Sequence, residues 1–318
     1  MRRWCGAGRA PRRMRPQRER REPTGERRAQ ADRPHPVSER QASRTAEGAA
    51  LLRAAHQALD GEPKILDDPV AIHLLGPSSA EAIRAGEPLQ EPTVRLARAA
   101  TVLGGRFIED ELCSAVERGV RQYVVLGAGL DTFAYRQPSW ASVLRIIEVD
   151  HPASQQNKRE RLAAAGLSIP PNVAFVPIDF ELTTLADGMA SDRFDATLPT
   201  FFAWRGVTQY LTRPGIEATL RYVLSLPRSS EIALTFCLPD AVAGEDEAAV
   251  RFFAQYGAGL GEPWLSRFEP ERMVEWLREL GFSAVTHLTP EAARERYFGG
   301  RNDGLRAPIY EQVVSAIV

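Results

Sequence analysis

The chain has 318 residues, of which 44% are hydrophobic and 25% charged. This length accommodates one large α/β domain with additions, or two small domains, and the apolar fraction suffices for a substantial core. No apolar run approaches the roughly 18–20 residues that cross a bilayer, so we expect no membrane partner. The three cysteines lie far apart, which argues against a disulfide framework and a metal site, and we expect a protein of the reducing cytoplasm.

The net charge of −1 conceals an asymmetry, because residues 1–33 carry twelve arginines against four acidic residues and leave the remainder near −9. Such an arm can contact nucleic acid or a membrane surface. It has no apolar segment typical of a signal peptide, no serine typical of a transit peptide, and no periodic apolar residues. We therefore predict that residues 1–36 are a disordered leader, or sequence upstream of the true start codon, and expect no nucleic-acid partner.

Residues 37–119 carry helical patterns. The segment 46–59 is rich in Ala and Leu, a short helix is predicted from 67 to 75, and a longer helical stretch covers 92–118 and ends at a glycine. We expect these helices to form an N-terminal cover over the rest of a domain that spans 37–318.

From residue 121 strands and helices alternate, which predicts an α/β fold with a mostly parallel sheet and helices on both faces over 120–318. The predicted strands are 121–126, 143–149, 173–178, 200–204, 230–237 and 282–287. The predicted helices are 153–165, 181–189, 214–226 and 270–280. Residues 239–265, which contain several glycines, are predicted to be an inserted loop over the site.

The site is expected where the strands end, because ligands of open α/β sheets bind beyond the carboxyl ends of the strands. Gly127-Ala128-Gly129 follows the first strand, and the next helix is expected to offer free N–H groups to a ligand. A dinucleotide fingerprint needs a third glycine, but Thr132 occupies that position. A pyrophosphate therefore fits less well than a ligand without phosphates, such as S-adenosyl-L-methionine (SAM).

Two acidic residues, Glu148 and Asp150, end the second strand. Asp150 lies where a bidentate carboxylate meets the hydroxyls of a ribose, and Glu148 points to the same side but deeper. Asp150 can instead cap the helix that starts at Pro152, and the two roles are compatible. We interpret His151 as a structural hydrogen-bonding residue rather than a general base.

The third and fourth strands add further candidates. Asp179 can accept the exocyclic amine of adenine or serve as a helix N-cap, and Phe180 can pack on the base. Residues 204–211 would lie beneath the methionine part of SAM. Their aromatic residues either pack in the core or face the sulfonium, a contact worth on the order of 1–2 kcal/mol when desolvated.

Several ordered motifs together resemble those of the leucine carboxyl methyltransferase-like family, in particular its bacterial branch of SAM-dependent methyltransferases. The motifs are Gly119–Arg136, Glu148–Pro152, Val176–Glu181, Gly206–Thr212, Ser43–Ala46, Arg106–Leu112 and Ala293–Leu305. The resemblance covers about residues 38–318. It implies a Rossmann-like class I methyltransferase fold with an N-terminal helical cover.

The resemblance also implies SAM contacts at Gly127, with Gly129 beside it, and at Asp150, Asp179 and Phe180.

Basic positions of the family that bind the methionine carboxylate match Arg106 and, secondarily, Arg44; a planar guanidinium suits that group. The alternative for Arg106 is an exposed position on a helix surface. Arg205 stands where relatives often carry an acid near the methionine amino group, so we do not assign that role to it.

We expect transfer of a methyl group from SAM to an oxygen of a small metabolite or carboxylate, with the acceptor between residues 200–212, the N-terminal helices and residues 239–265. A carboxylate acceptor needs no base, and no catalytic residue is assigned. The alternatives are a non-catalytic SAM-binding protein, a nicotinamide-dependent oxidoreductase, which Thr132 opposes, and methylation of a terminal carboxylate of a protein.

Overall fold

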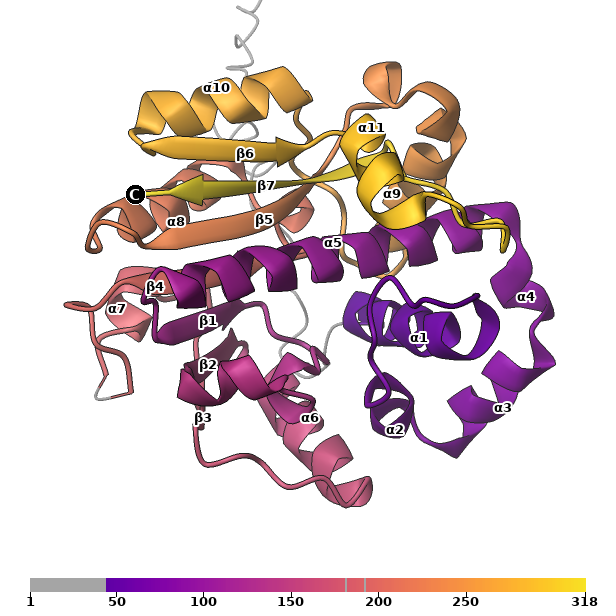
Figure 1. The fold of residues 1–318 in the computed structure, drawn as a ribbon, viewed down its shortest axis with the longest axis horizontal. Helices are drawn as coiled ribbons and strands as arrows, with labels where there is room; N and C mark the ends of the chain where they lie inside the picture. The colour runs from indigo at the N-terminus through magenta and orange to yellow at the C-terminus, as the bar shows by residue number, and fades with distance from the viewer. Residues whose placement is uncertain (1–43, 181, 192) are drawn as a thin grey trace, which may run out of the picture. The chain divides into compact units, whose positions relative to one another are not determined.

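The computed structural model describes residues 44–180, 182–191 and 193–318, and the predicted leader lies outside them. Within these ranges seven strands form one sheet in the order β3-β2-β1-β4-β5-β7-β6 (Figure 1). The strands are β1 (Gln122–Leu126), β2 (Arg145–Asp150), β3 (Val173–Pro177), β4 (Thr200–Trp204), β5 (Glu231–Cys237), β6 (Ala284–Leu288) and β7 (Glu311–Ile317). β1 to β5 are parallel, and β7 runs antiparallel between β5 and β6. The mostly parallel sheet is confirmed.

The strand β7 was not predicted. Gln312 and Ser315 interrupt its apolar run, yet both are buried because their side chains bond to His287 and Glu231 of the neighbouring strands. These partners come from distant parts of the chain, so the local pattern did not show a buried strand.

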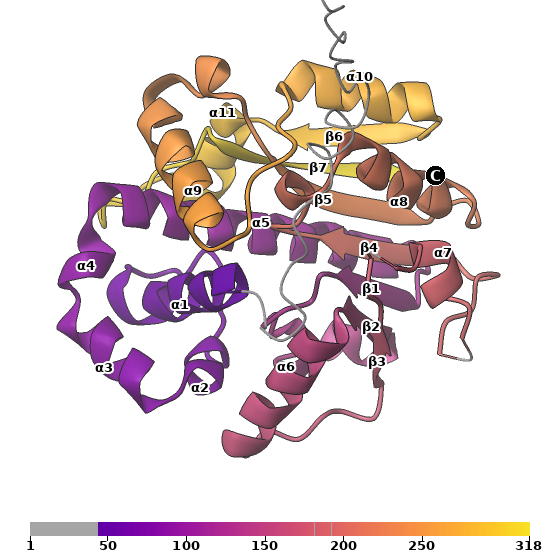
Figure 2. The ribbon, with the colours of Figure 1, turned by 180° about the vertical axis from the view of Figure 1, so that it is seen from behind.

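Helices cover both faces of the sheet, as predicted (Figures 1 and 2). On one face α5 (Pro92–Glu117) packs on Tyr123 and Val125 of β1. On the other face α8 (Arg213–Leu224) and α10 (Pro270–Leu280) belong to the cluster around Val124 and Leu126. This alternation follows from the strand geometry, which points successive side chains to opposite faces.

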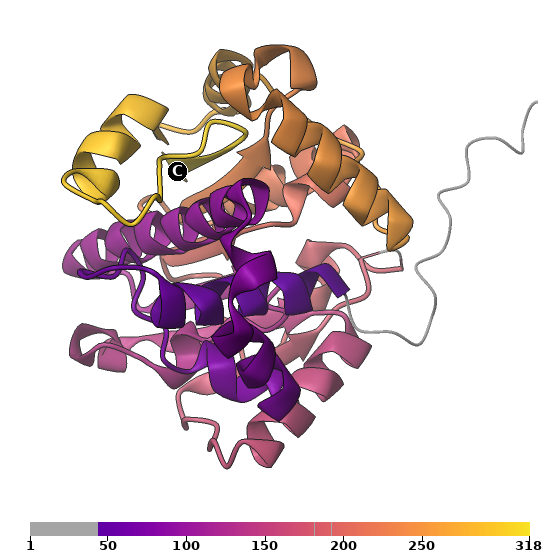
Figure 3. The same cartoon turned by 90° about the vertical axis from the view of Figure 1, so that its right-hand side faces the viewer.

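The N-terminal helices lie at the carboxyl end of the parallel strands, on the side that faces the viewer in Figure 3. They are α1 (Arg44–Leu59), α2 (Ala71–Leu75), α3 (Pro77–Ala85) and α4 (Glu87–Gln90). The first two match the predicted helices, whereas α3 and α4 were not predicted. The cover therefore sits where a ligand of this sheet is expected.

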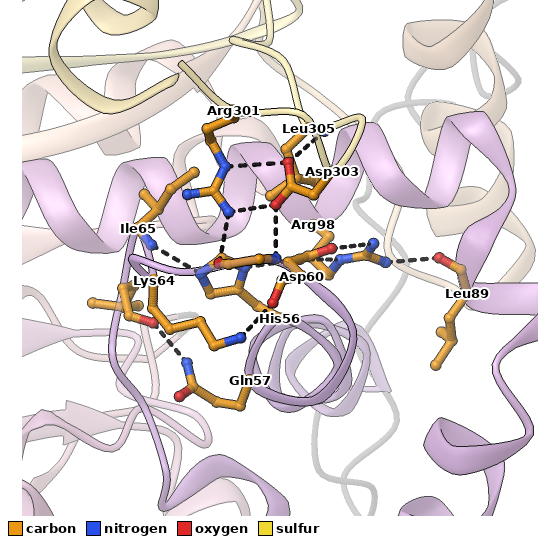
Figure 4. Close-up of polar contacts among 12 residues, drawn as sticks. His56, Gln57, Asp60, Lys64, Ile65, Leu89, Arg98, Arg301, Asp303 and Leu305 are labelled. Carbon is orange, nitrogen blue, oxygen red and sulfur yellow. Dashed lines mark hydrogen bonds and ion pairs between the residues drawn. The ribbon is translucent and has the colours of Figure 1, made fainter. Parts of the chain in front are cut away.

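A buried polar cluster fastens α1 to α5 (Figure 4). Asp60 accepts hydrogen bonds from Nε and Nη2 of Arg98 at 2.7 and 2.8 Å, and lies 2.8 Å from Nδ1 of His56. Nε2 of His56 accepts from the backbone of Ile65, so Nδ1 carries the proton. Removing one partner of such a buried ion pair typically costs roughly 3–5 kcal/mol, so this cluster holds the cover in place.

Residues 239–265 are not the predicted irregular loop. They contain the turns η4 (Asp240–Val242) and η5 (Gly244–Asp246) and the helix α9 (Glu247–Gly259), whose Val250 packs in a cluster with Leu96 of α5. The glycines misled the prediction because Gly257 serves packing rather than a turn. A Cβ there would lie 2.7 Å from the carbonyl oxygen of Glu262.

The remaining helices are α6 (Pro152–Ala164), α7 (Leu185–Gly188), α11 (Pro290–Ala293) and the π-helical turn η6 (Arg294–Phe298). α7 is shorter than the predicted helix 181–189, whose residue 181 lies outside the described ranges. None of the helices in the described part of the chain is apolar over enough residues to span a membrane.

Candidate cofactor site

The glycine turn at the end of β1 leaves no room for larger residues. Gly127 has φ +65°, and a Cβ there would lie 2.5 Å from Cγ2 of Val207. A positive φ is strained for other residues, so both conformation and space select glycine. The turn tightens where the amide of Asp131 donates to the carbonyl of Ala128 at 2.7 Å.

The predicted α-helix after this turn is wrong. The segment forms only the short 3-10 turns η1 (Phe133–Tyr135) and η2 (Ser139–Val143). Aligned peptide dipoles of a long helix are therefore absent directly after β1, and this edge is less suited to a phosphate than a dinucleotide fold.

Asp150, at the end of β2, faces the glycine turn. Its Oδ2 accepts a hydrogen bond from the amide of Gly129 at 2.5 Å, and its Oδ1 accepts from the amide of His151 at 2.6 Å. Burial raises the pKa of Asp150, although these two amide bonds favour the ionised form. Each carboxylate oxygen has more than one acceptor site, so the oriented group can still accept the two hydroxyls of a diol.

The helix cap next to Asp150 is His151. Its Nδ1 accepts a hydrogen bond from the amide of Ala153 at 3.2 Å, at the start of α6. The alternative that Asp150 caps this helix is therefore wrong, and His151 has a structural role, as predicted.

Glu148 lies below Asp150 and is buried. Its Oε2 is 2.7 Å from Nζ of Lys158, and the hydroxyl of Tyr135 donates to it at 3.3 Å. Its Oε1 has no hydrogen-bond partner among the described residues. Burial raises the pKa of Glu148 to about 7 against the opposing charge of Lys158. This layer supports the site from beneath.

Asp179 and Phe180 follow β3 at the same edge. The amide of Ile178 donates to the carbonyl of Asp150 at 2.9 Å, which holds this segment beside the end of β2. Oδ2 of Asp179 lies 3.7 Å from Nε2 of His151, and the Phe180 side chain is 44% exposed. The structure thus gathers Gly127, Gly129, Asp150, Asp179 and Phe180 at one edge of the sheet.

Arg106 lies elsewhere. Its Nε pairs with Oδ1 of Asp110 at 2.9 Å one helical turn away, and its side chain is 46% exposed. Asp110 also bonds to Arg296 and Tyr297 of η6, away from the glycine turn. The alternative of an exposed helix position therefore describes Arg106. Arg44 is exposed at the start of α1, where its backbone amide donates to Glu262.

The sequence analysis missed residues of the cover that support the glycine turn. Arg53 of α1, buried, donates to the carbonyl of Leu130 at 2.6 Å and to Asp68 at 2.8 Å. Asp68 also accepts from the hydroxyl of Thr132 at 2.6 Å. The signal was present in the sequence, because Arg53 stands in the middle of an Ala- and Leu-rich helix where a charge needs a buried partner.

A second missed pair lies beside the turn. Asp131 follows the glycines, and Arg205 follows β4; Nη2 of Arg205 donates to Oδ2 of Asp131 at 2.8 Å.

Three chain segments converge over the site. The start of α1 approaches the turn, since a Cβ on Gly129 would lie 3.1 Å from that of Ala46. The hydroxyl of Thr45 bonds to Glu262, after α9, and the amide of Leu265 donates to the carbonyl of Gln209 in η3 (Thr208–Tyr210) at 2.6 Å. These segments are the ones between which the acceptor was predicted.

Comparison with known proteins gives concordant results. The sequence model of the leucine carboxyl methyltransferase family matches residues 46–224. YktD of Bacillus subtilis, which carries the name of a SAM-dependent methyltransferase, is 34% identical over 203 residues, which span 63% of this chain and 66% of YktD. FRAAL3718 of Frankia alni, named likewise, is 30% identical over 256 residues, which span 78% of this chain and 85% of that protein.

Among solved structures, a DUF574 family protein of Streptomyces avermitilis superposes with a TM-score of 0.50 at 18% identity. The superposition covers 84% of this chain and 96% of that one. At this identity the likeness concerns the fold alone.

Proposed function

We propose a function from one premise: this chain belongs to the leucine carboxyl methyltransferase family, and is a SAM-dependent methyltransferase with the predicted Rossmann-like class I fold. On that premise it transfers the methyl group to an oxygen of a small acceptor, a metabolite hydroxyl or a carboxylate. The observation that carries the proposal is the Asp150 carboxylate, held by the amide of Gly129 beside the glycine turn.

The residues at this edge fit SAM. Gly127 holds the backbone turn in a conformation with positive φ, and Asp150 offers acceptors for the ribose hydroxyls. Phe180 is an exposed aromatic ring within reach of an adenine. Thr132 is buried and bonded to Asp68, so the third glycine of a dinucleotide site is replaced by a structural residue. This disfavours the oxidoreductase alternative.

The protein has mainly to position the reactants. SAM supplies the electrophilic methyl group, and an acceptor oxygen must approach it in line. The start of α1, η3 and the segment after α9 bond to one another over the site, and on this proposal they exclude water from it. Such positioning supplies several kcal/mol, up to about 7–11 in ideal systems.

The groups near the acceptor region favour an acceptor that needs no base. Burial raises the pKa of Tyr210 to about 12, so at neutral pH its hydroxyl is a hydrogen-bond donor. His151 is engaged in capping α6. A carboxylate acceptor is already a nucleophile at neutral pH and could accept a bond from Tyr210, which makes it the acceptor class we favour.

Calorimetric titration with SAM, S-adenosylhomocysteine and NAD tests the cofactor, and methyl-labelled SAM with a panel of small carboxylic acids and phenols tests the acceptor. We expect binding of both adenosyl compounds, no binding of NAD, and base-labile methyl ester formation. Binding without transfer to any acceptor would favour the non-catalytic alternative.

A further inference from the structure

The ion pair between Arg205 and Asp131 lies at the carboxyl ends of β4 and β1, beside the glycine turn. The Arg205 side chain is 18% exposed and that of Asp131 17% exposed. Both groups are therefore held mostly within the protein, and part of each stays exposed. No role was assigned to either from the sequence.

The helix α5 is shaped to admit Arg205. A Cβ on Gly105 would lie 2.8 Å from Nη1 of Arg205 and equally close to Cδ2 of Leu66. One on Gly104 would lie 3.0 Å from Cγ2 of Thr235 and 3.6 Å from Cδ of Arg205. The carbonyl of Thr101, in the preceding turn, accepts from Nη1 at 3.2 Å. Glycine inside a helix is unfavourable by roughly 1 kcal/mol relative to alanine, so Gly105 marks a place where close packing against the guanidinium and Leu66 outweighs helix propensity.

Both members of the ion pair are charged, and hydrogen bonds fix their orientation. Oδ1 of Asp131 accepts from the amide of Phe133 at 2.9 Å. Burial alone would raise the pKa of Asp131, but the charges of Arg205, Arg53 and Lys158 hold it at about 2. Among the described residues, the hydrogen bonds of Arg205 use Nη1 and Nη2, and the guanidinium has further N–H donors.

We propose that Arg205 and Asp131 together bind the amino-acid end of SAM, with the guanidinium donating to the α-carboxylate and the Asp131 carboxylate accepting from the α-ammonium. This inference rests on the proposed function. The α-carbon of SAM carries both charges close together, and the ion pair presents the complementary two. Arg106, the residue predicted for the carboxylate, pairs with Asp110 on an exposed face instead.

Three ligands distinguish the contribution of the α-carboxylate of SAM from that of its α-ammonium. SAM carries both groups, decarboxylated SAM lacks the carboxylate, and methylthioadenosine lacks the whole amino-acid part. The variants are Arg205→Gln, Asp131→Asn and the control Arg106→Gln, with affinities measured by calorimetry on the full-length protein.

We expect Arg205→Gln to weaken SAM binding roughly 10–100-fold, the range of a charge-assisted hydrogen bond, while decarboxylated SAM and methylthioadenosine keep their affinities. Asp131→Asn should weaken SAM and decarboxylated SAM but not methylthioadenosine. Arg106→Gln should change none of the three.

Equal weakening of all three ligands by Arg205→Gln would overturn the inference in favour of a structural role, and unchanged SAM affinity would overturn it outright. If Arg205→Gln does not fold, Arg205→Lys retains the charge without the planar fork and should give a smaller loss confined to SAM. Failure of the proposed function looks different, because the unmodified protein would then either bind none of the three ligands or bind SAM without transferring its methyl group to any acceptor.

Discussion

Polar groups are arranged differently at the two ends of the parallel strands. At the amino end, polar side chains satisfy one another: Gln122 bonds to Thr200 and to the backbone of Asp195, and Glu231 bonds to Ser315 and Arg118. At the carboxyl end Asp150, Asp131 and Arg205 are oriented by backbone groups or by one another and stay partly exposed. Polar groups that bond fully to one another stabilise the fold, whereas polar groups with unused donors and acceptors can bind a ligand.

The presence of a cavity does not by itself identify the candidate site. A cavity of about 260 Å³ lies at the amino ends of β2 and β3, lined by residues that include Arg145, Asn172 and Arg193. Neither the glycine turn nor Asp150 borders it. The candidate site therefore rests on charge placement and backbone geometry and not on empty volume.

The largest expected effect is that of Gly127→Ala. The positive φ costs roughly 1–2 kcal/mol for alanine, and the overlap with Val207 adds roughly 1–3 kcal/mol. We expect the free energy of unfolding to fall by about 3 kcal/mol in chemical denaturation, with loss of SAM binding.

The control for Gly127→Ala lies at the other end of β1. Gly119 has φ +101° and open space around its Cβ position, so Gly119→Ala should cost only the backbone strain and leave SAM affinity unchanged. Equal effects of the two variants would contradict the proposed difference between the ends.

Two buried glutamates should make the free energy of unfolding depend on pH. Burial raises the pKa of Glu148 and of Glu231 to about 7, above the value of 4.5 for an unperturbed glutamate. Because the folded-state pKa of each glutamate is raised, each one contributes to the free energy of unfolding at low pH. This contribution is fully present below pH 4.5 and is lost as the pH rises to about 7. At about 1.4 kcal/mol per pKa unit, each loss is at most roughly 3 kcal/mol.

Glu148→Gln and Glu231→Gln should each flatten the dependence of unfolding free energy on pH between 5 and 8, measured by denaturation at several pH values. Only Glu148→Gln should also change the pH dependence of SAM affinity, since Glu231 lies at the amino end. An unaltered stability profile in both variants would rule out these glutamates as its source.

Asp150→Asn should have a smaller effect on folding and a specific one on binding. A neutral amide oxygen accepts more weakly than a carboxylate, so we expect SAM affinity to fall by about 2 kcal/mol, roughly 30-fold, in calorimetry. Gln122→Ala, its counterpart at the amino end, should lower stability while leaving SAM affinity unchanged. Undiminished affinity in folded Asp150→Asn would remove the basis of the proposed cofactor site.

The smallest expected effect is that of Thr132→Val. The variant removes the hydroxyl that bonds to buried Asp68, at a cost of roughly 1–2 kcal/mol in unfolding free energy. SAM affinity should fall only slightly, because Arg53 still holds Asp68 and Leu130. Tighter NAD binding in this variant would contradict the structural role of Thr132.

What the amino-acid sequence determined by itself is that the residues of the candidate site gather at one edge of the sheet. Gly127 and Asp150 each stand at the end of an apolar run, and strand ends follow from local periodicity and turn chemistry, which act over a few residues. The strand β4 has the predicted bounds, Thr200–Trp204.

Only the tertiary structure decided which charges meet at that edge. Arg205 and Asp131 are 74 residues apart, and Thr132 and Asp68 are 64 apart. The helical phase of α5 turned Arg106 toward Asp110 while its glycines admitted Arg205. Long-range pairing depends on how helices pack on the sheet, so no local pattern could distinguish the arginine beside the site from the one outside it.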